Sequence, residues 1–287
     1  MSSLIVQKNL NAATSMLNKS IERMTTGYKI NHAADNAAGY SIATTWKTQL
    51  GSLDVASDNA STGADMLTTL EDTYSLITSH LQRVRDLTEQ AANGTYGSDS
   101  LKAIASEITA RLEEIDRISA NCEFNGLKMM DGSLTDDINL QVGLYSDAAS
   151  RIALDASLFQ NGHVSALFKT FGGVGGATVA EVAKLCSGYD GKQITGGQNE
   201  MLNKIDAVIS EISARTTTLG AAQNRIESAV ESINVQSENI TSSLSTLRDA
   251  DVAEESSNYI KAQILQQASA TLLATANQTP SIALNLV

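Results

Sequence analysis

Proline and aromatic residues are scarce in this chain of 287 residues. Its single proline, Pro280, lies near the C-terminal end, and Phe, Trp and Tyr together make up 4% of the chain. Without proline to interrupt it, the backbone before residue 280 is free to form very long helices. With so few rings, a core has to be built mainly from Leu, Ile, Val and Ala.

Basic residues are also few. The chain has 20 Lys and Arg against 32 Asp and Glu, a net charge of -12. This balance argues against partners such as nucleic acid or an anionic membrane, which are bound through Lys and Arg. No apolar run approaches the roughly 18 residues of a membrane span. The first apolar run, Leu4-Ile5-Val6, is shorter than the core of a secretory signal. We therefore expect a protein that is cytoplasmic or exported by a route that removes no such peptide.

The sequence contains no recognisable catalytic or metal-binding constellation. Two cysteines, Cys122 and Cys186, are too few for a disulfide framework and lack metal-ligand spacing, although a single disulfide between them stays open. The three histidines are isolated from one another. The run Gly172–Gly176 lacks the Gly-Lys-Ser/Thr ending of a phosphate-binding loop. We expect no enzyme, no metal and no cofactor.

The C-terminal third carries the most regular pattern in the chain. Seven aliphatic residues, which we call the seam, recur at intervals of seven: Ile205, Ile212, Leu219, Ile226, Ile233, Ile240 and Leu247. A strict seven-residue repeat keeps one side of a helix facing a partner and indicates a left-handed supercoil. A helix from about residue 198 to 248 would be roughly 75 Å long and needs long partner helices.

The N-terminal half offers two such partners. Apolar residues alternate by three and four from Leu67 to Val84, and a second set from Leu101 to Ile118 falls on one face of a helix. Further on, polar and apolar residues alternate in 137–143 and 151–155, which predicts two short strands. The predicted fold is mainly α: an elongated helical bundle or coiled coil with a small β-hairpin region and paired N- and C-terminal helices.

Both ends of the chain have helical spacing but thin apolar faces. The residues expected to make contacts there are Leu10, Leu17, Met24, Ile260, Ile264, Leu265, Leu272 and Leu286. Helices with so little apolar surface are marginal alone. We expect them to be disordered in a free monomer and to order by packing on each other or on other copies of the chain.

Several blocks give the chain a specific resemblance. Ser20 to Asn31, with the sequence SIERMTTGYKIN, and the following Ala34 to Gly39 resemble the N-terminal signature of bacterial flagellins. Leu81 to Leu87, Arg111 to Ile118 and Lys261 to Ala268 resemble later blocks of the same family, in the same order. The likeness covers about residues 1–160 and 198–287. The chain departs from the family at Cys122 and Cys186, since flagellins usually lack cysteine.

The resemblance implies a structural subunit that polymerises into the flagellar filament. Residues 1–38 and 249–287 would form the coiled-coil filament core. Residues 39–158 and 198–248 would form a helical wall domain, with β-hairpins at about 124–158. Residues 159–197 would form a reduced outer segment, so that the large outer domains of longer flagellins are missing. The filament lies outside the cell, and export would use the flagellar type III apparatus.

The resemblance also implies partners. These are further copies of the chain, an export chaperone, and the cap and hook-junction proteins. A vertebrate Toll-like flagellin receptor would contact the monomer at Arg83, Leu87 and Glu107. From the residues alone, Arg83 and Glu107 could instead form a solvated ion pair with Leu87 in the core. The alternative functions are a hook–filament junction protein, whose N-terminal motif usually has proline where this chain has Ala37-Ala38-Gly39, and a cytoplasmic coiled-coil adaptor.

Overall fold

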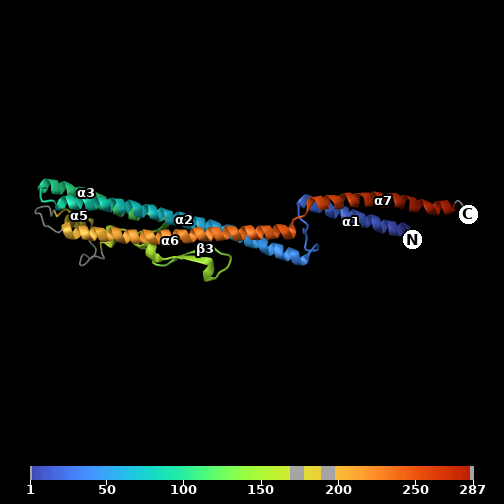
Figure 1. The fold of residues 1–287 in the computed structure, drawn as a ribbon, viewed down its shortest axis with the longest axis horizontal. Helices are drawn as coiled ribbons and strands as arrows, with labels where there is room; N and C mark the ends of the chain where they lie inside the picture. Colours follow the sequence, from blue (N-terminus) through green and yellow to red (C-terminus); the bar gives the residue numbers. More distant parts are fainter. Residues whose placement is uncertain (1, 169–177, 189–197, 285–287) are drawn as a thin grey trace. The chain divides into compact units, whose positions relative to one another are not determined.

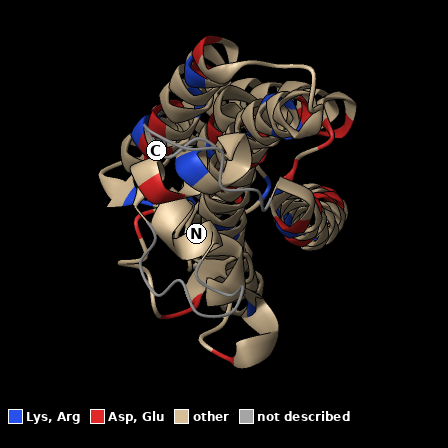
Figure 2. Ribbon diagram, turned by 90° about the vertical axis from the view of Figure 1, so that its left-hand side faces the viewer, with Lys and Arg blue, Asp and Glu red and all other residues tan. Residues whose placement is uncertain are grey.

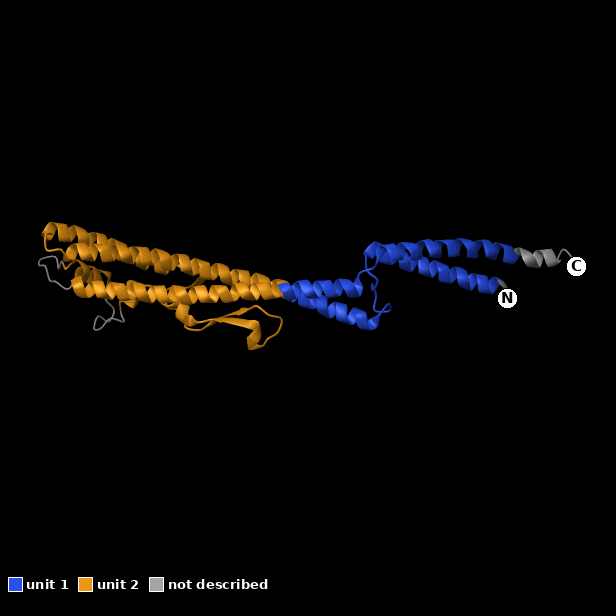
Figure 3. Ribbon diagram, in the orientation of Figure 1, with its two compact units in different colours: residues 1–52, 235–287 blue, residues 53–234 orange. Residues whose placement is uncertain are grey.

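The computed structural model describes residues 2–168, 178–188 and 198–284. These divide into two compact units, one of residues 1–52 and 235–287 and the other of residues 53–234 (Figure 3). The Gly172–Gly176 run and Leu286 lie outside the described residues.

Helices dominate both units (Figure 1). The α-helices are α1 (Ser2–Thr26), α2 (Ala37–Ala92), α3 (Ser98–Asn121), α4 (Val164–Leu167), α5 (Val179–Ser187), α6 (Gln198–Arg248) and α7 (Val252–Leu284). The strands are β1 (Glu123–Phe124), β2 (Leu127–Lys128), β3 (Ile138–Gln141) and β4 (Arg151–Leu154), with 3-10 turns η1 (Ala148–Ser150) and η2 (Ala156–Phe159). The mainly α class expected from the sequence is confirmed.

The core of the second unit forms where α2, α3 and α6 bury their apolar faces. On α2 the whole predicted row is buried: Leu67, Leu70, Tyr74, Ile77, Leu81 and Val84. On α3 the buried row runs from Leu101 to Ile115. The hydroxyl of Tyr74 donates a hydrogen bond to the carbonyl of Leu158, 2.9 Å away. That bond ties the long helix to the segment after β4 and satisfies a polar group inside the core.

Two antiparallel hairpins make up the β region. In the first, Phe124 pairs with Leu127, and the intervening Asn125 and Gly126 have φ of 51° and 85°. Positive φ at both positions is typical of the tight hairpin turn that Asn-Gly favours. In the second, Ile138 pairs with Leu154 and Gln141 with Arg151. Gly63 of α2 lies against Leu140 of β3, where any side chain would collide with the leucine.

Both cysteines are buried free thiols, so the disulfide left open by the sequence is not formed. Burial raises the pKa of Cys186 to about 12, and it also raises the pKa of Cys122. The two thiols therefore belong to the packing of the second unit.

Candidate functional site

The helices of the two chain ends, α1 and α7, pack side by side in the first unit (Figure 1). The buried positions of these two helices are Glu255 and four small residues: Ala13, Ser20, Ala262 and Ser269. Such small residues let two helices approach closely but bury little apolar surface. Gln266 donates a hydrogen bond to Thr14 Oγ1 at 3.3 Å, and Ser3 donates one to Asn277 Oδ1 at 3.0 Å. These two contacts show that the helices run antiparallel.

Most of the larger apolar side chains of this helix pair are exposed. Of the predicted contact residues, Leu10 and Leu17 are half-buried, whereas Met24, Ile260, Ile264, Leu265 and Leu272 are exposed. The exposed fraction reaches 61% at Ile264 and 70% at Leu4. We call the exposed side chains the arm surface: Leu4, Met24, Ile260, Ile264, Leu265 and Leu272. Exposed apolar surface of this kind is typical of protein interfaces.

Two connectors join the terminal helices to α2 and α6: residues 27–36 follow α1, and residues 249–251 precede α7. We call these two connectors the joint. Gly27 ends α1 with a φ of 76°, a conformation that glycine adopts without strain. Lys29 N–H donates to the carbonyl of Arg248 at 2.7 Å, and Ala250 N–H donates to that of Gly27 at 2.8 Å. The guanidinium of Arg248 lies 4.2 Å from the centre of the Tyr28 ring. The backbone hydrogen bonds and the cation–π contact thus hold the two connectors together.

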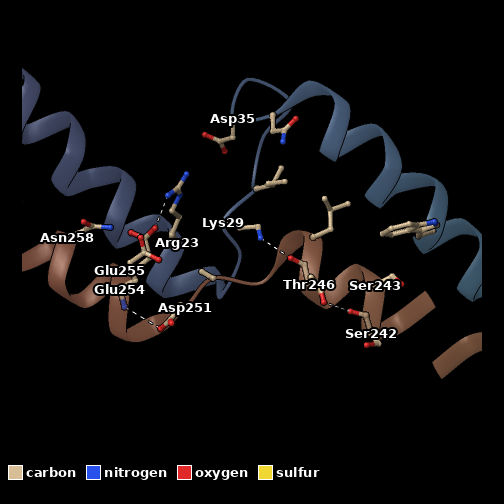
Figure 4. Close-up of a pocket in the computed structure, with 15 residues that line it drawn as sticks. Arg23, Lys29, Asp35, Ser242, Ser243, Thr246, Asp251, Glu254, Glu255 and Asn258 are labelled. Carbon is tan, nitrogen blue, oxygen red and sulfur yellow. Dashed lines mark hydrogen bonds and ion pairs between the residues drawn. The ribbon is translucent and has the colours of Figure 1, made fainter. Parts of the chain in front are cut away.

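A groove of about 860 Å³ opens at this joint (Figure 4). Its charged lining includes Arg23 and Glu255, whose side chains form an ion pair at 2.7 Å, and the Glu255 side chain is only 8% exposed. Lys29 Nζ donates to the carbonyl of Thr246 at 2.8 Å. The indole of Trp46 lies on another wall of the same groove. The joint is therefore rich in polar contacts between segments that lie far apart in the sequence.

Asp35 holds the loop that precedes α2. Its carboxylate lies 2.8 Å from Lys19 Nζ and accepts hydrogen bonds from the backbone N–H groups of Asn31 and His32, both at 3.2 Å. The bond to Lys19, with the backbone bond from His32, lowers the pKa of Asp35 to about 2. The carboxylate is therefore charged over the whole physiological range.

The seam lies along α6 as one continuous apolar side. Its first five members, from Ile205 to Ile233, are at most 5% exposed, while Ile240 and Leu247 are half-buried. Polar contacts also join this helix to α2, since Gln223 donates a hydrogen bond to Glu71 at 2.9 Å.

The residues considered for receptor binding divide between surface and core. Arg83 donates from Nε and Nη2 to Glu107 Oε1 at 2.9 and 2.8 Å, linking α2 to α3 at an exposed position. Leu87 is 1% exposed. Its side chain packs in the core because it follows Val84 on the buried face of α2. Of the three, only Arg83 and Glu107 are therefore accessible to a partner.

The sequence reasoning missed the pairing of Arg23 with Glu255. Arg23 lies in the Ser20–Asn31 block, whereas Glu255 lies in none of the blocks that carry the resemblance. No local pattern indicates which charges meet across 232 residues of chain. Their surroundings in the sequence are the one available indication of this pairing, since each residue lies on a helix that is otherwise rich in Ala, Ser, Thr and Asn. A long charged side chain in such a place has little apolar cover unless it meets an opposite charge.

Other kinds of site find no support among the described residues. No group of three or more His, Cys, Asp and Glu is placed there to hold a metal ion. Within the same residues, no helix combines the length and apolarity required to span a membrane. Acidic and basic residues are interspersed over the helices (Figure 2).

The described residues thus form a mainly helical protein whose paired end helices carry a surface suited to contacts with other protein chains. Comparison with known proteins specifies the assembly. The model of the bacterial flagellin N-terminal helical region matches residues 1–135, and that of the flagellin C-terminal helical region matches residues 202–287. The chain belongs to the bacterial flagellin family, as the resemblance indicated, and is a structural subunit of the flagellar filament, outside the cell.

Individual relatives match over almost their whole length. The chain is 33% identical to flagellin of Bacillus subtilis, over 97% of this chain and 95% of the relative. It is 30% identical to flagellin FlaB1 of Treponema pallidum, over 100% and 98%. Among solved structures, a putative flagellar hook-associated protein from Vibrio parahaemolyticus shares the fold, with a TM-score of 0.62 and 12% identity over 75% of this chain and 100% of that one. The last likeness concerns the fold alone.

Proposed function

We propose that the arm surface on α1 and α7 is the element through which copies of this chain polymerise. The observation that carries this proposal is the exposure of Ile260, Ile264 and Leu272, each more than half exposed, on a helix whose buried residues other than Glu255 are small. Complete burial of one such side chain stabilises a contact by about 1.5–3 kcal/mol. A contact of this kind, repeated between different faces of successive copies, does not close on itself and gives a helical filament.

The seam has a different role in this proposal. Its members from Ile205 to Ile233 are already covered within one chain, so they stabilise the helical bundle and leave no surface for a second copy. Polymerisation and bundle stability would then depend on separate sets of residues, and a variant in one set should leave the other property unchanged.

Deletion of residues 250–287 tests this division of roles. The truncated chain should not add to filament seeds, because it lacks the larger part of the arm surface. Its second unit should keep the urea midpoint of the full chain, because residues 53–234 remain intact. Elongation of seeds by the truncated chain would contradict the proposal.

We further propose, from family membership, that the chain leaves the cell through the flagellar type III apparatus, assisted by an export chaperone. The cap and hook-junction proteins would be its neighbours at the two ends of the filament. When the chain is expressed in a flagellated bacterium that lacks its own flagellin, it should be found outside the cells. It should stay inside when the gate proteins of the flagellar export apparatus are also deleted.

A vertebrate Toll-like flagellin receptor is the last partner we propose. The exposed ion pair of Arg83 and Glu107 supports this proposal, since an accessible arginine beside apolar core residues is a frequent anchor in protein interfaces. The buried Leu87 is not part of the proposed contact.

A further inference from the structure

The small residues along the terminal helix pair repeat in a way that leaves its register open. Ala262, Ser269 and Ala276 lie seven residues apart on α7, and Ala13 and Ser20 lie seven apart on α1. In the observed pairing, Thr14 meets Gln266. A slide of seven residues would bring Thr14 beside Leu273 and would again place small residues against small ones. The small residues of this contact therefore do not by themselves distinguish the two registers.

The ion pair between Arg23 and Glu255 does distinguish them. In the observed register, Arg23 Nη1 lies 2.7 Å from the Glu255 carboxylate, whose side chain is more than nine-tenths buried. In the slid register, Arg23 would lie near Ala262, and Glu255 would lose its partner. A buried charge without a partner is strongly unfavourable, which is how single polar contacts select a register in helix pairs.

The backbone bonds of the joint are a second constraint on register. Lys29 and Ala250 each donate one such bond. These donors and their acceptors, Arg248 and Gly27, are half-buried, and the adjacent Tyr28 and Asp249 are exposed. Water can replace a backbone hydrogen bond at a half-buried position more readily than it can reach a buried carboxylate.

We propose that Arg23 and Glu255 are the positioning residues that select a single register of α1 against α7. This inference rests on the proposed role of the terminal helices in polymerisation. Register decides which apolar side chains lie next to each other on the arm surface. One subunit with slid helices would therefore present a surface that does not match its neighbours in the filament.

Pairs of engineered cysteines can report the register in the full chain. In a background with Cys122 and Cys186 replaced by alanine, Thr14→Cys with Gln266→Cys reports the observed register. Thr14→Cys with Leu273→Cys reports the slid one. Oxidation of free full-length chains, without seeds, traps the registers that the helix pair samples. Peptide mass spectrometry on mixtures of isotope-labelled and unlabelled chains then separates cross-links within a chain from those between chains.

Glu255→Ala is the test variant, and Glu254→Ala is its matched control. Glu254 is the exposed neighbour in the same first turn of α7, so its removal costs the same charge. Glu255→Ala should lower the ratio of observed to slid cross-link by about tenfold or more, while Glu254→Ala should leave the ratio unchanged. The charge exchange Arg23→Glu with Glu255→Arg should restore the ratio.

Two results would overturn the proposal. An unchanged ratio in Glu255→Ala would show that the joint backbone alone sets the register. Loss of both cross-links would show that the ion pair stabilises helix pairing without selecting a register. Neither result depends on whether α7 is required for seed elongation, which the deletion of residues 250–287 tests separately.

Discussion

Ile226 is the residue at which the bundle is most directly testable. It lies midway along the seam and is 1% exposed. An aspartate there would bury a carboxylate without a partner, so we expect Ile226→Asp to lower the free energy of unfolding by about 3 kcal/mol or more. Ser232→Asp, at an exposed position of the same helix, is the control and should stay close to the parent. Urea unfolding monitored by circular dichroism gives the midpoints. Equal midpoints for the two variants would contradict the assignment of the seam as core.

Arg83 tests the proposed receptor contact. Replacing it with alanine should weaken binding of the monomer to the receptor ectodomain by about tenfold, the usual effect of removing an arginine anchor. Bundle stability should change little, because exposed ion pairs contribute at most about 1 kcal/mol. Arg117→Ala is a matched control, since Arg117 is also exposed and pairs with Glu114 on α3. Equal affinity of the Arg83 variant and the parent would remove Arg83 from the site.

Among the elements, those with strong periodicity were predictable, whereas the first part of α2, which buries mainly small residues, was not. The row from Leu67 to Val84 predicted part of α2, but the helix begins thirty residues earlier, at Ala37. In the earlier part, the positions facing inward include Ala56, Ala60 and Gly63. Small residues carry no apolar signal, although they have the same spacing of three and four. A helix rich in Ala, Ser and Thr is thus under-predicted by hydrophobic pattern alone.

Candidate sites followed the same rule. The sequence indicated which residues at the chain ends are apolar, because that depends on residue type and spacing. It did not indicate the joint, where Tyr28 pairs with Asp249 in an isolated bridge. Contacts between segments this far apart depend on the complete path of the chain, and a local pattern does not contain that information.

The joint should respond to acid through Asp35. Its pKa is lowered from 3.8 to about 2 by Lys19 and the backbone of His32. A lowered pKa means that the carboxylate stabilises the folded joint above pH of about 4, and that this contribution is lost as the pH falls through about 2. Trp46, the single tryptophan, lines the same groove. We expect its fluorescence to change in this pH window in the parent chain.

Asp35→Asn provides the comparison. The variant should lack the fluorescence change between pH values of about 4 and 2, because the titrating group is gone. Asp131→Asn is the control: the pKa of Asp131 is also lowered, through its hydrogen bonds with Ser133, but it belongs to the second unit. A parent-like acid transition in Asp35→Asn would show that another group controls the joint.

At the scale of the whole molecule, the two units should differ in how strongly they depend on assembly. In the second unit, side chains such as Leu112 and Ile212 are at most 1% exposed, so a single chain suffices to cover them. In the terminal helices, most of the large apolar residues are exposed, and the buried residues other than Glu255 are small. Because ordering a helix costs conformational entropy that only burial offsets, the terminal helices depend on neighbours for their stability.

Hydrogen exchange should make this difference visible. In free monomers, we expect backbone amides of α1 and α7 to exchange at least about a hundredfold faster than those of residues 205–233, since local stability follows buried apolar contact. In filaments, amides of both sets should be protected, because neighbouring copies cover the arm surface. The segment 205–233 is the internal control, since its seam residues are buried in one chain and its protection should change little on assembly. Equal protection of α1 and α7 in the monomer and in the filament would contradict this prediction. It would show that the two helices are stable as a pair without neighbours, and that polymerisation joins chain ends that are already folded.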